Sequence, residues 1–454
     1  MKDRFHSKAL GICWTLLAVA GGARAQTTAE VNAGVQFNFS TPGARSLGLG
    51  GAFIGLADDA TAAYANPAGL TVLSEPEVSF EGRNWSYENT FVDGGRFNGQ
   101  PTGRGVDTVA GLRGGSSEST VAGVSFLSAV YPGRRWTVAL YRHELANYEA
   151  EFASSGTFKD EAATGNMPRN RPKLNSFSLD AVNLGLSGAI RLGDRFSVGA
   201  GISSYSFSLR SRTDRYHLDP ALGVDPGGTF GPPLFTPGNL TDTQIQKGDD
   251  RQTGFNAGFL WNIGRGWTVG GVYRQGPEFD LDATYIPGPR ADAGVQKVTV
   301  PALYDTPDVF GLGVAVQPTE LTTVTLDCVR VKYSDLTRSF TNILLRLPMP
   351  PAGADLRNFK IKDATEIHLG FERNFLLGST LLAARAGAWY DPDHRLRYTG
   401  TTTGFLATFR PGRDETHYAA GLGFISRRLK LQADAAFDFS DPVKTASLST
   451  VVRF

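Results

Sequence analysis

The sequence predicts an all-β protein, a 14-stranded antiparallel transmembrane β-barrel with an N-terminal plug in its lumen. Three observations predict this fold. Strand-like runs alternate between apolar and polar side chains, short and long connections follow one another in strict order, and the last alternating run ends the chain on an aromatic residue, Phe454. A soluble β-sandwich also has alternating strands, but it gives no reason for the chain to end on an aromatic side chain.

The alternation is clearest in the run 429–439. One face of this run carries Leu429, Leu431, Ala433, Ala435, Phe437 and Phe439, and the other carries Lys430, Gln432, Asp434, Ala436 and Asp438. A period of two places successive side chains on opposite faces of a sheet. In a transmembrane barrel one face meets lipid and the other meets the lumen, so we expect this run to cross a membrane.

The first 25 residues predict a secretory signal peptide. Lys2, Arg4 and Lys8 precede or begin the apolar run 9–20, and Ala23-Arg24-Ala25 supplies the cleavage pattern. About 12 apolar residues are too few for a helix that spans a bilayer. No later segment approaches 18 consecutive apolar residues. A membrane location therefore requires a closed barrel, in which every backbone group is paired.

Fourteen runs fit the strands of a barrel. They lie near 76–87, 119–130, 134–150, 174–192, 194–211, 250–263, 265–286, 305–317, 320–333, 362–375, 377–391, 413–426, 428–440 and 443–454. Long connections are expected at 88–118, 151–173, 212–249, 287–304, 334–361 and 392–412. Short turns lie between them, as a barrel with tight periplasmic turns and long external loops requires; the one exception is the last external connection, 440–442, which is short. We expect a signal peptide at 1–25, a hatch at 26–75 and the barrel at 76–454.

Composition and motifs argue against other classes of protein. The 45 basic and 44 acidic residues are balanced, which gives no case for binding nucleic acid. Beyond the signal peptide Cys328 stands alone, which excludes an intrachain disulfide and a cysteine-based metal site. His143-Glu144 begins a near miss to H-E-x-x-H, but Asn147 replaces the second ligand, and positions i and i+4 of a strand lie about 13 Å apart. No G-x-S-x-G motif occurs. We expect no enzyme, metal site or cofactor.

Residues 26–75 do not have the sequence pattern of barrel strands. A glycine-rich stretch at 43–53 is followed by an alanine-rich stretch at 56–70, which contains Asp58-Asp59-Ala60 and Asn66-Pro67-Ala68. Irregular chain of this kind cannot face lipid, because its backbone groups would lack partners there. We therefore expect this segment to lie in the lumen or in the periplasm.

The segment resembles the N-terminal hatch of the FadL/TodX family of hydrophobic-compound transporters. Members of that family carry a glycine-rich run, an acidic segment that precedes alanine, and an Asn-Pro-Ala motif, which Asn66, Pro67 and Ala68 match here. Later pieces agree in order, at Tyr273-Arg274, at 331–334 and at 385–391. The resemblance thus touches most of the mature chain, and the hatch is its most specific part.

This resemblance implies a protein of the outer membrane of a Gram-negative bacterium that takes up long-chain fatty acids or other hydrophobic compounds passively. Aromatic hydrocarbon uptake and a structural role in a secretion system are the alternatives. The implied partners are hydrophobic small molecules, outer-membrane lipid and lipopolysaccharide, and the barrel assembly machinery, with the protein acting as a monomer. A lumen filled with ion pairs would favour the structural role, whereas a connected apolar path would favour transport.

Three groups of residues are candidates for the site. Asp58 and Asp59 are expected to cap a hatch element or to pair with lumen arginines, rather than to act as acid and base. Asn66-Pro67-Ala68 is either an ordinary turn or an anchor of the hatch on the wall. Apolar residues of two long loops, expected either to form a landing groove for a ligand or to cap the barrel mouth, are Phe230, Leu234, Phe235, Ile343, Leu344, Leu345, Leu347 and Met349.

Overall fold

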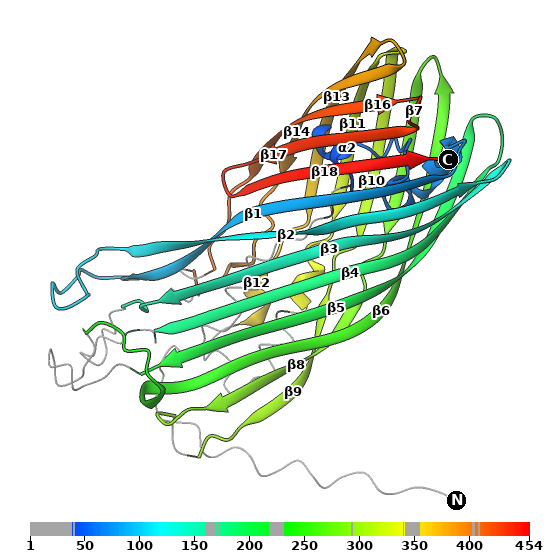
Figure 1. The fold of residues 1–454 in the computed structure, drawn as a ribbon. Coiled ribbons are helices and arrows are strands. Elements are labelled where there is room, and N and C mark those ends of the chain that lie inside the picture. The colour runs from blue at the N-terminus through cyan, green and yellow to red at the C-terminus, as the bar shows by residue number, and fades with distance from the viewer. Residues whose placement is uncertain are drawn as a thin grey trace, which may run out of the picture.

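The computed structural model describes residues 39, 41–158, 169, 172–217, 231–291, 294–338, 340, 355–401, 405–406 and 409–454. Antiparallel strands form a closed barrel with short helices inside it (Figure 1). The helices are α2 (Ala44–Gly48), α3 (Ala62–Ala65), η1 (Pro67–Val72), η3 (Pro237–Asn239) and η4 (Leu356–Asn358). No helix in these ranges is long and apolar enough to cross a membrane.

The strands account for most of the described chain. They are β1 (Glu77–Gly95), β2 (Leu112–Pro132), β3 (Trp136–Ser154), β4 (Lys173–Arg191), β5 (Phe196–Tyr216), β6 (Leu240–Gly264), β7 (Trp267–Arg274), β8 (Glu278–Pro287), β9 (Val298–Asp305), β10 (Val309–Thr319), β11 (Thr322–Val331), β12 (Phe359–Lys360), β13 (Ala364–Leu377), β14 (Thr380–Asp391), β15 (Arg397–Tyr398), β16 (Glu415–Ser426), β17 (Leu431–Phe439) and β18 (Val443–Arg453). Most match the alternating runs of the sequence.

The ring closes with 14 strands, as the sequence predicts. Its order is β5, β4, β3, β2, β1, β18, β17, β16, β14, β13, β11, β10, β7 and β6, and the pairing of β6 with β5 completes it. The first and last strands pair side by side, and the Phe454 amide donates to the Pro76 carbonyl oxygen at 3.1 Å. The start of β1 and the end of β18 therefore lie at the same end of the barrel.

The strands β8 and β9 add no position to this ring. They extend its wall outward, and β9 pairs with β8. β6 pairs with β7 through 256–264 and with β8 through 242–247. β7 and β8 thus pair with the same strand, β6, one after the other, and a break that contains Pro277 separates them. The run 265–286, predicted as one strand, is therefore two strands in line. The connection expected at 287–304 was wrong in part, because it contains most of β9. Pro301 lies inside β9, and a proline within a strand weakens its signal in the sequence.

Several strands also extend farther than the sequence predicts. β1 ends at Gly95 rather than 87, and β6 begins at Leu240 rather than 250. The outward side chains of these extensions are largely hydroxylic or charged. Once a strand leaves the bilayer, neither face requires the apolar alternation by which strands were found, so these ends resemble loops in the sequence.

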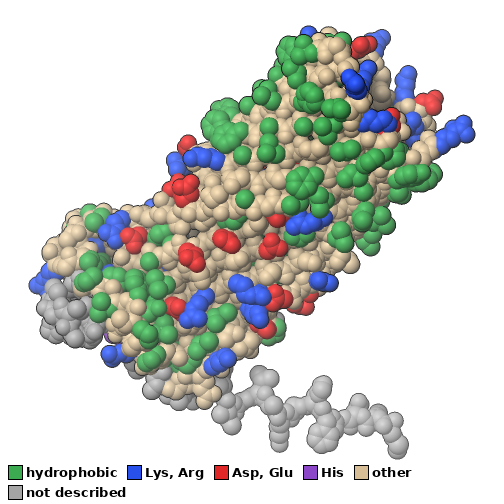
Figure 2. Space-filling view, in the orientation of Figure 1, with side chains coloured by type: hydrophobic (Ala, Val, Ile, Leu, Met, Phe, Trp, Pro, Cys, Tyr) green, Lys and Arg blue, Asp and Glu red, His purple; other side chains and the backbone are tan. Residues whose placement is uncertain are grey.

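The outer surface separates into an apolar and a charged part. In Figure 2 hydrophobic side chains gather over the upper right of the barrel, around the strand ends near the C-terminus, while charged side chains cross the middle of the visible face. The inside and outside faces of β17 confirm the predicted alternation, because Phe437 and Phe439 are exposed whereas Asp434 and Asp438 are buried. The exposed apolar band is the lipid-facing surface.

Candidate functional site

The hatch, which we define as residues 41–73, fills the lumen. All but a few of its residues are buried. α2 packs against β14, β16, β17 and β18, whereas η1 packs against β3, β4, β5 and β6. Figure 1 places α2 within the ring of strands. The hatch therefore reaches from one wall of the barrel to the other; residues 26–38 of the expected plug lie outside the described residues.

Glycines of the wall allow the hatch backbone to approach it closely. A Cβ atom at Gly387 of β14 would overlap the amide nitrogen of Gly50, and one at Gly421 of β16 would lie 3.1 Å from the Gly48 Cα. Such spacing leaves no room for side chains. The small inward residues of β16, among them Ala419 and Gly421, thus admit a close-packed plug.

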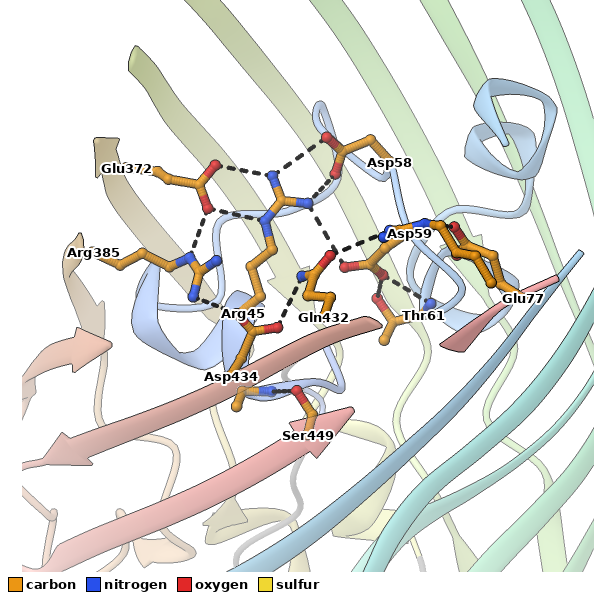
Figure 3. Close-up of polar contacts among 12 residues, drawn as sticks. Arg45, Asp58, Asp59, Thr61, Glu77, Glu372, Arg385, Gln432, Asp434 and Ser449 are labelled. Atoms are coloured by element: carbon orange, nitrogen blue, oxygen red, sulfur yellow. Dashed lines mark hydrogen bonds and ion pairs between the residues drawn. The ribbon is translucent and has the colours of Figure 1, made fainter. Parts of the chain in front are cut away.

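An ionic network joins the hatch to one wall of the barrel (Figure 3). Arg45 of α2 donates to Asp58 at 2.6 Å and, through two nitrogens, to Glu372 of β13 at 3.0 and 3.1 Å. Arg385 of β14 donates to the same Glu372 at 2.6 Å and to Asp434 of β17 at 2.7 Å. Charge-assisted bonds of this kind are strong when the groups are buried and paired.

The network continues to the first strand. Gln432 donates to Asp434 at 2.8 Å and accepts a hydrogen bond from Arg453 at 3.2 Å. Arg453 in turn donates to Glu77 at 2.7 Å. Polar side chains of β13, β14, β17, β18 and β1 are thus linked to one another, and Arg45 brings the hatch into the same network.

The acidic pair of the hatch makes an ion pair and turn hydrogen bonds within the hatch. Asp58 binds Arg45, and Asp59 accepts from the Thr61 amide at 2.9 Å and from its hydroxyl at 2.5 Å, just before α3. The arginine belongs to the hatch itself rather than to the wall. Burial lowers the pKa of Arg45, but the carboxylates of Asp58 and Glu372 outweigh it and raise this pKa well above its usual value.

Asn66 joins the hatch to the opposite wall. Its side chain is fully buried, and its Nδ2 donates to the carbonyl oxygens of Ile54 and of Phe259 on β6, both at 3.0 Å. Its Oδ1 accepts from the Ala68 amide at 3.2 Å and caps η1. Pro67 occupies the first position of η1, where its missing N–H is harmless. The motif is therefore a turn and a wall contact at once.

Outward of the hatch the barrel interior contains a large apolar cluster. Buried side chains of β3, β4, β5 and β7 to β11, with a few from β1, β13 and β18, form this cluster with Phe39 and Ile54. Its members on the wall include Leu145, Tyr148, Phe177, Leu179, Ala181, Phe207, Leu209, Phe279, Leu281, Ala283, Tyr304 and Val331. Besides the ionic network, an apolar part of the interior therefore also reaches the hatch, at Ile54.

The wall has a seam between β2 and β3. Their backbone pairing ends at Phe126 and His143, although both strands continue outward. Beyond that point side chains of β1 bridge to β3: Tyr87 stacks on Tyr148 with ring centroids 4.6 Å apart, and the Tyr87 hydroxyl donates to the Glu149 carbonyl oxygen at 2.8 Å. The backbone ladder between β2 and β3 is thus missing here and side chains bridge the gap, while at the outer end the Ser155 amide donates to the Asp93 carbonyl oxygen at 2.8 Å.

The base of the seam contacts the hatch. Tyr64 of α3 packs against His143 with ring centroids 4.1 Å apart, and Arg274 of β7 lies 4.7 Å from the Tyr64 ring centroid. Arg274 also donates to the Ala65 carbonyl oxygen at 2.9 Å. The histidine of the near-miss zinc motif thus packs against the hatch, and the Tyr273-Arg274 pair singled out in the sequence contributes one hatch contact.

The loop residues proposed for a landing groove are only partly described. Leu234 and Phe235 are half-buried, and the Phe235 ring meets Tyr216 edge-on at 5.2 Å. Phe230, Ile343, Leu344, Leu345, Leu347 and Met349 lie outside the described residues. Phe340, from the same loop as residues 343–349, packs with the connection 392–412 in a cluster of Phe359, Leu396, Tyr398, Phe405 and Phe409. The groove therefore stays a prediction.

Arg45 and Arg385 were not predicted from the sequence. Arg385 lies directly across from Glu372 in the register of β13 and β14, and both point inward. The sequence could have indicated this pair, because opposite charges occur at inward positions of two consecutive predicted strands and cross-strand partners interact. For Arg45 no such signal existed, because the irregular hatch has no register with the wall.

Comparison with known proteins agrees with this architecture. The family model described as "Outer membrane protein transport protein (OMPP1/FadL/TodX)" matches residues 25–448. A long-chain fatty acid transport protein of Escherichia coli O6:H1 is 27% identical over 281 residues, which are 60% of this chain and 56% of that protein. The chain thus matches little more than half the length of this relative.

Solved structures share the fold over nearly the whole chain. A FadL homologue of Pseudomonas aeruginosa superimposes with a TM-score of 0.62 and 16% identity, covering 92% of this chain and 99% of that one. The Pseudomonas putida toluene transporter TodX gives a TM-score of 0.57 and 14% identity at the same coverage. With the family match across the barrel and the hatch, the chain belongs to the OMPP1/FadL/TodX family of outer membrane transport proteins.

Proposed function

We propose that the protein carries long-chain fatty acids or comparable hydrophobic compounds passively across the outer membrane. One observation carries the proposal: the outward interior is a continuous apolar cluster that ends on Phe39 and Ile54 at the hatch. Apolar surface leaves water readily, so such an interior favours a hydrophobic solute that a water-filled pore would not. Two relatives, a long-chain fatty acid transport protein and a toluene transporter, are named for cargo of this class.

The seam between β2 and β3 supplies a route out of the interior. There β2 and β3 have no backbone ladder between them, and Tyr87 of β1 packs across the gap on Tyr148 of β3, so parting β2 from β3 breaks no ladder hydrogen bonds. The hatch closes the path toward the periplasm, since wall glycines and ion pairs hold it in the lumen. We infer that cargo enters from the outer loops, rests in the apolar interior and leaves sideways when the hatch shifts.

The structural role in an assembly is the weaker alternative. Such a role would be supported by ion pairs throughout the lumen. The described buried ion pairs group around Arg45 and Arg385, with others such as Arg83–Glu81 and Arg215–Asp242 elsewhere, and they leave one large apolar cluster uninterrupted. Further expectations from the sequence also remain proposals: that the protein acts as a monomer, that its outer surface meets lipopolysaccharide, and that the strand ending in Phe454 is read by the barrel assembly machinery.

Uptake by whole cells tests the proposal. Cells lacking their own transporter of this kind are given labelled oleate or labelled toluene, with and without this protein in the outer membrane. We expect a gain for at least one of the two, and the stronger gain identifies the cargo. A protein that is correctly inserted but increases neither uptake would overturn the proposal.

A further inference from the structure

A small polar cavity separates the hatch from the wall formed by β13, β14 and β16. Its volume is about 70 Å³, and its lining includes Gly50 and Gly51 from the hatch and His368, Trp389 and His417 from the wall. Phe39 and Tyr333, members of the apolar cluster, line it too. The cavity thus lies where the apolar interior meets the hatch.

Three lining side chains, His368, Trp389 and His417, belong to a row on neighbouring strands that begins with Asp327. Asp327, His368, Trp389 and His417 are successive cross-strand partners on β11, β13, β14 and β16. Trp389 stacks on His368 with ring centroids 5.2 Å apart and on His417 with centroids 3.9 Å apart. The His368 ring is therefore fixed in orientation by its neighbours.

His368 holds the hatch directly. Its Nδ1 lies 2.7 Å from the carbonyl oxygen of Gly50, and its Nε2 lies 3.2 Å from the Glu366 carboxylate. A Cβ atom at Gly51 would lie 3.0 Å from Nδ1, so the glycine turn fits closely against the ring. Gly50 and Gly51 both have positive φ angles, 63° and 80°, which glycine adopts without strain.

The two contacts of His368 determine how many protons His368 and Glu366 hold between them. A carbonyl oxygen only accepts, so Nδ1 carries a hydrogen that it donates to Gly50. An ionised Glu366 also only accepts, so Nε2 needs a second hydrogen to bond it; alternatively a protonated Glu366 donates to Nε2. In either case the closed arrangement holds one proton more than a neutral imidazole beside a carboxylate.

We propose that this proton, shared between His368 and Glu366, is a latch that keeps the hatch closed. Without it the lone pair of Nε2 faces a carboxylate, and the ring loses the position from which it donates to Gly50. A rise in pH then favours release of the hatch, and a fall in pH favours closure. The inference rests on the proposed movement of the hatch during uptake, which the family assignment alone does not supply.

The other charged groups around the cavity have partners of their own. Across from His368, Asp327 accepts from the Phe53 amide at 2.6 Å and from the Ile54 amide at 2.7 Å, so it is a second ionisable group that holds the hatch. On the far side Arg83 of β1 donates to Glu81 at 2.9 Å. Only the His368–Glu366 pair among these groups needs an added proton to hold the hatch; Asp327 acts in the opposite sense, because its ionised form is the better acceptor for the hatch amides.

The two other histidines that line the cavity do not bond the hatch. His417 pairs with Asp438 at 2.9 Å, and Glu415 lies 3.8 Å from its other nitrogen. His394 pairs with Asp391 at 3.3 Å. They share the polarity and the burial of His368 but contact only the wall and an outer connection. They are therefore matched controls.

Hydrogen exchange of the hatch tests the latch without any uptake assay. Exchange of the amides of residues 49–53 is measured for the purified, detergent-solubilised protein at pH 6 and pH 8, with rates corrected for intrinsic exchange. Loss of one stabilising proton over two pH units weakens protection by up to about 100-fold. We expect the protection factor of these amides to fall by at least about tenfold between pH 6 and pH 8.

Variants separate the latch from general destabilisation. Glu366→Gln keeps the shape and can donate from its amide to a neutral ring, so we expect protection that is retained and independent of pH. His368→Phe should lose protection at both pH values, and His394→Gln should keep the pH dependence of the unmodified protein. Protection that is flat in the unmodified protein, or that keeps its pH slope in Glu366→Gln, would overturn the latch and leave the uptake result untouched.

Discussion

The Nδ2 atom of Asn66 in the hatch donates a hydrogen bond of 3.0 Å to the carbonyl oxygen of Phe259 on β6. A backbone carbonyl that already belongs to a strand thus receives a side chain from a segment nearly 200 residues earlier in the chain. The contact lies on the wall opposite to the Arg45 network. The hatch is therefore held from two sides, by a neutral anchor and by an ionic one.

Removal of the neutral anchor should loosen the hatch and spare the barrel. Asn66→Ala deletes the bonds to Ile54, Phe259 and Ala68, and leaves buried partners unsatisfied at a cost of about 1–3 kcal/mol each. We expect faster hydrogen exchange across residues 52–70 and an unchanged barrel circular dichroism spectrum. Asn84→Ala, at an exposed outward position, is the control and should change neither.

The space at this anchor is limited by a glycine of the wall. A Cβ atom at Gly258 would overlap the Asn66 Oδ1. Gly258→Ala should therefore weaken hatch protection about as much as Asn66→Ala does. Because both changes act through one contact, their effects in the double variant should be far less than additive. Fully additive losses would show that Gly258 acts elsewhere.

Loss of Arg45 should open a leak. Arg45→Met leaves Asp58 and Glu372 without their shared partner in a buried site, which costs about 3–5 kcal/mol. We expect the hatch to detach and hydrophilic dyes to enter cells that carry the variant. Arg330→Met removes an ion pair whose arginine is 49% exposed, a contact worth about 0–1 kcal/mol, and should not leak. Equal behaviour of the two variants would contradict the role of the network.

A polar group in the apolar interior should slow uptake. Leu281 is buried in the cluster, so Leu281→Gln places an amide where a hydrophobic solute would rest. Uptake of the preferred cargo should fall several-fold, with the amount of inserted protein unchanged. The neighbouring Asp282 points outward, and Asp282→Asn should leave uptake intact. A cargo path outside this cluster would make the two variants indistinguishable.

The outer connection 392–412 should stay anchored to the wall at neutral pH. Burial lowers the pKa of His394, but the Asp391 carboxylate outweighs this effect and raises the pKa to about 9. A raised pKa means that the pair stabilises the fold fully below about pH 6.5, the ordinary value, and that this contribution is lost as pH rises through 9. Nuclear magnetic resonance of the labelled imidazole should show a midpoint near pH 9.

The Asp391→Asn variant identifies the cause of that shift. With the carboxylate removed, burial dominates and the His394 midpoint should fall below its ordinary value. A midpoint near 6.5 in the unmodified protein, or one that Asp391→Asn leaves in place, would show that the pair does not form.

The sequence predicted the parts of the wall that lie in lipid. β17 and β18 alternate because one face must be apolar and the other polar, and their exposed Phe437 and buried Asp434 follow that rule. β9 and the outer end of β6 were not found, since their surroundings do not impose the same contrast. Alternation is informative only where the two faces of a strand differ.

The sequence indicated which hatch residues make contacts, but it did not indicate the residues that they contact. Asn66 and Asp58 stand out in the sequence as a motif, yet nothing in it indicates that Phe259 or Arg45 would receive them. A strand register sets pairs such as Glu372 and Arg385, and only the closed ring sets that register. His368 reveals its role only through Gly50, which lies 318 residues away.

The most direct test fixes the hatch and measures transport. In a Cys328→Ser background, cysteines replace Ala44 and Ser449, where the Ala44 amide lies 3.1 Å from the Ser449 hydroxyl, so that oxidation ties α2 to β18. Uptake of labelled oleate or toluene should stop in the oxidised protein and return when the disulfide is reduced. Equal uptake in both states would show that hydrophobic solutes pass without movement of the hatch and would contradict the account.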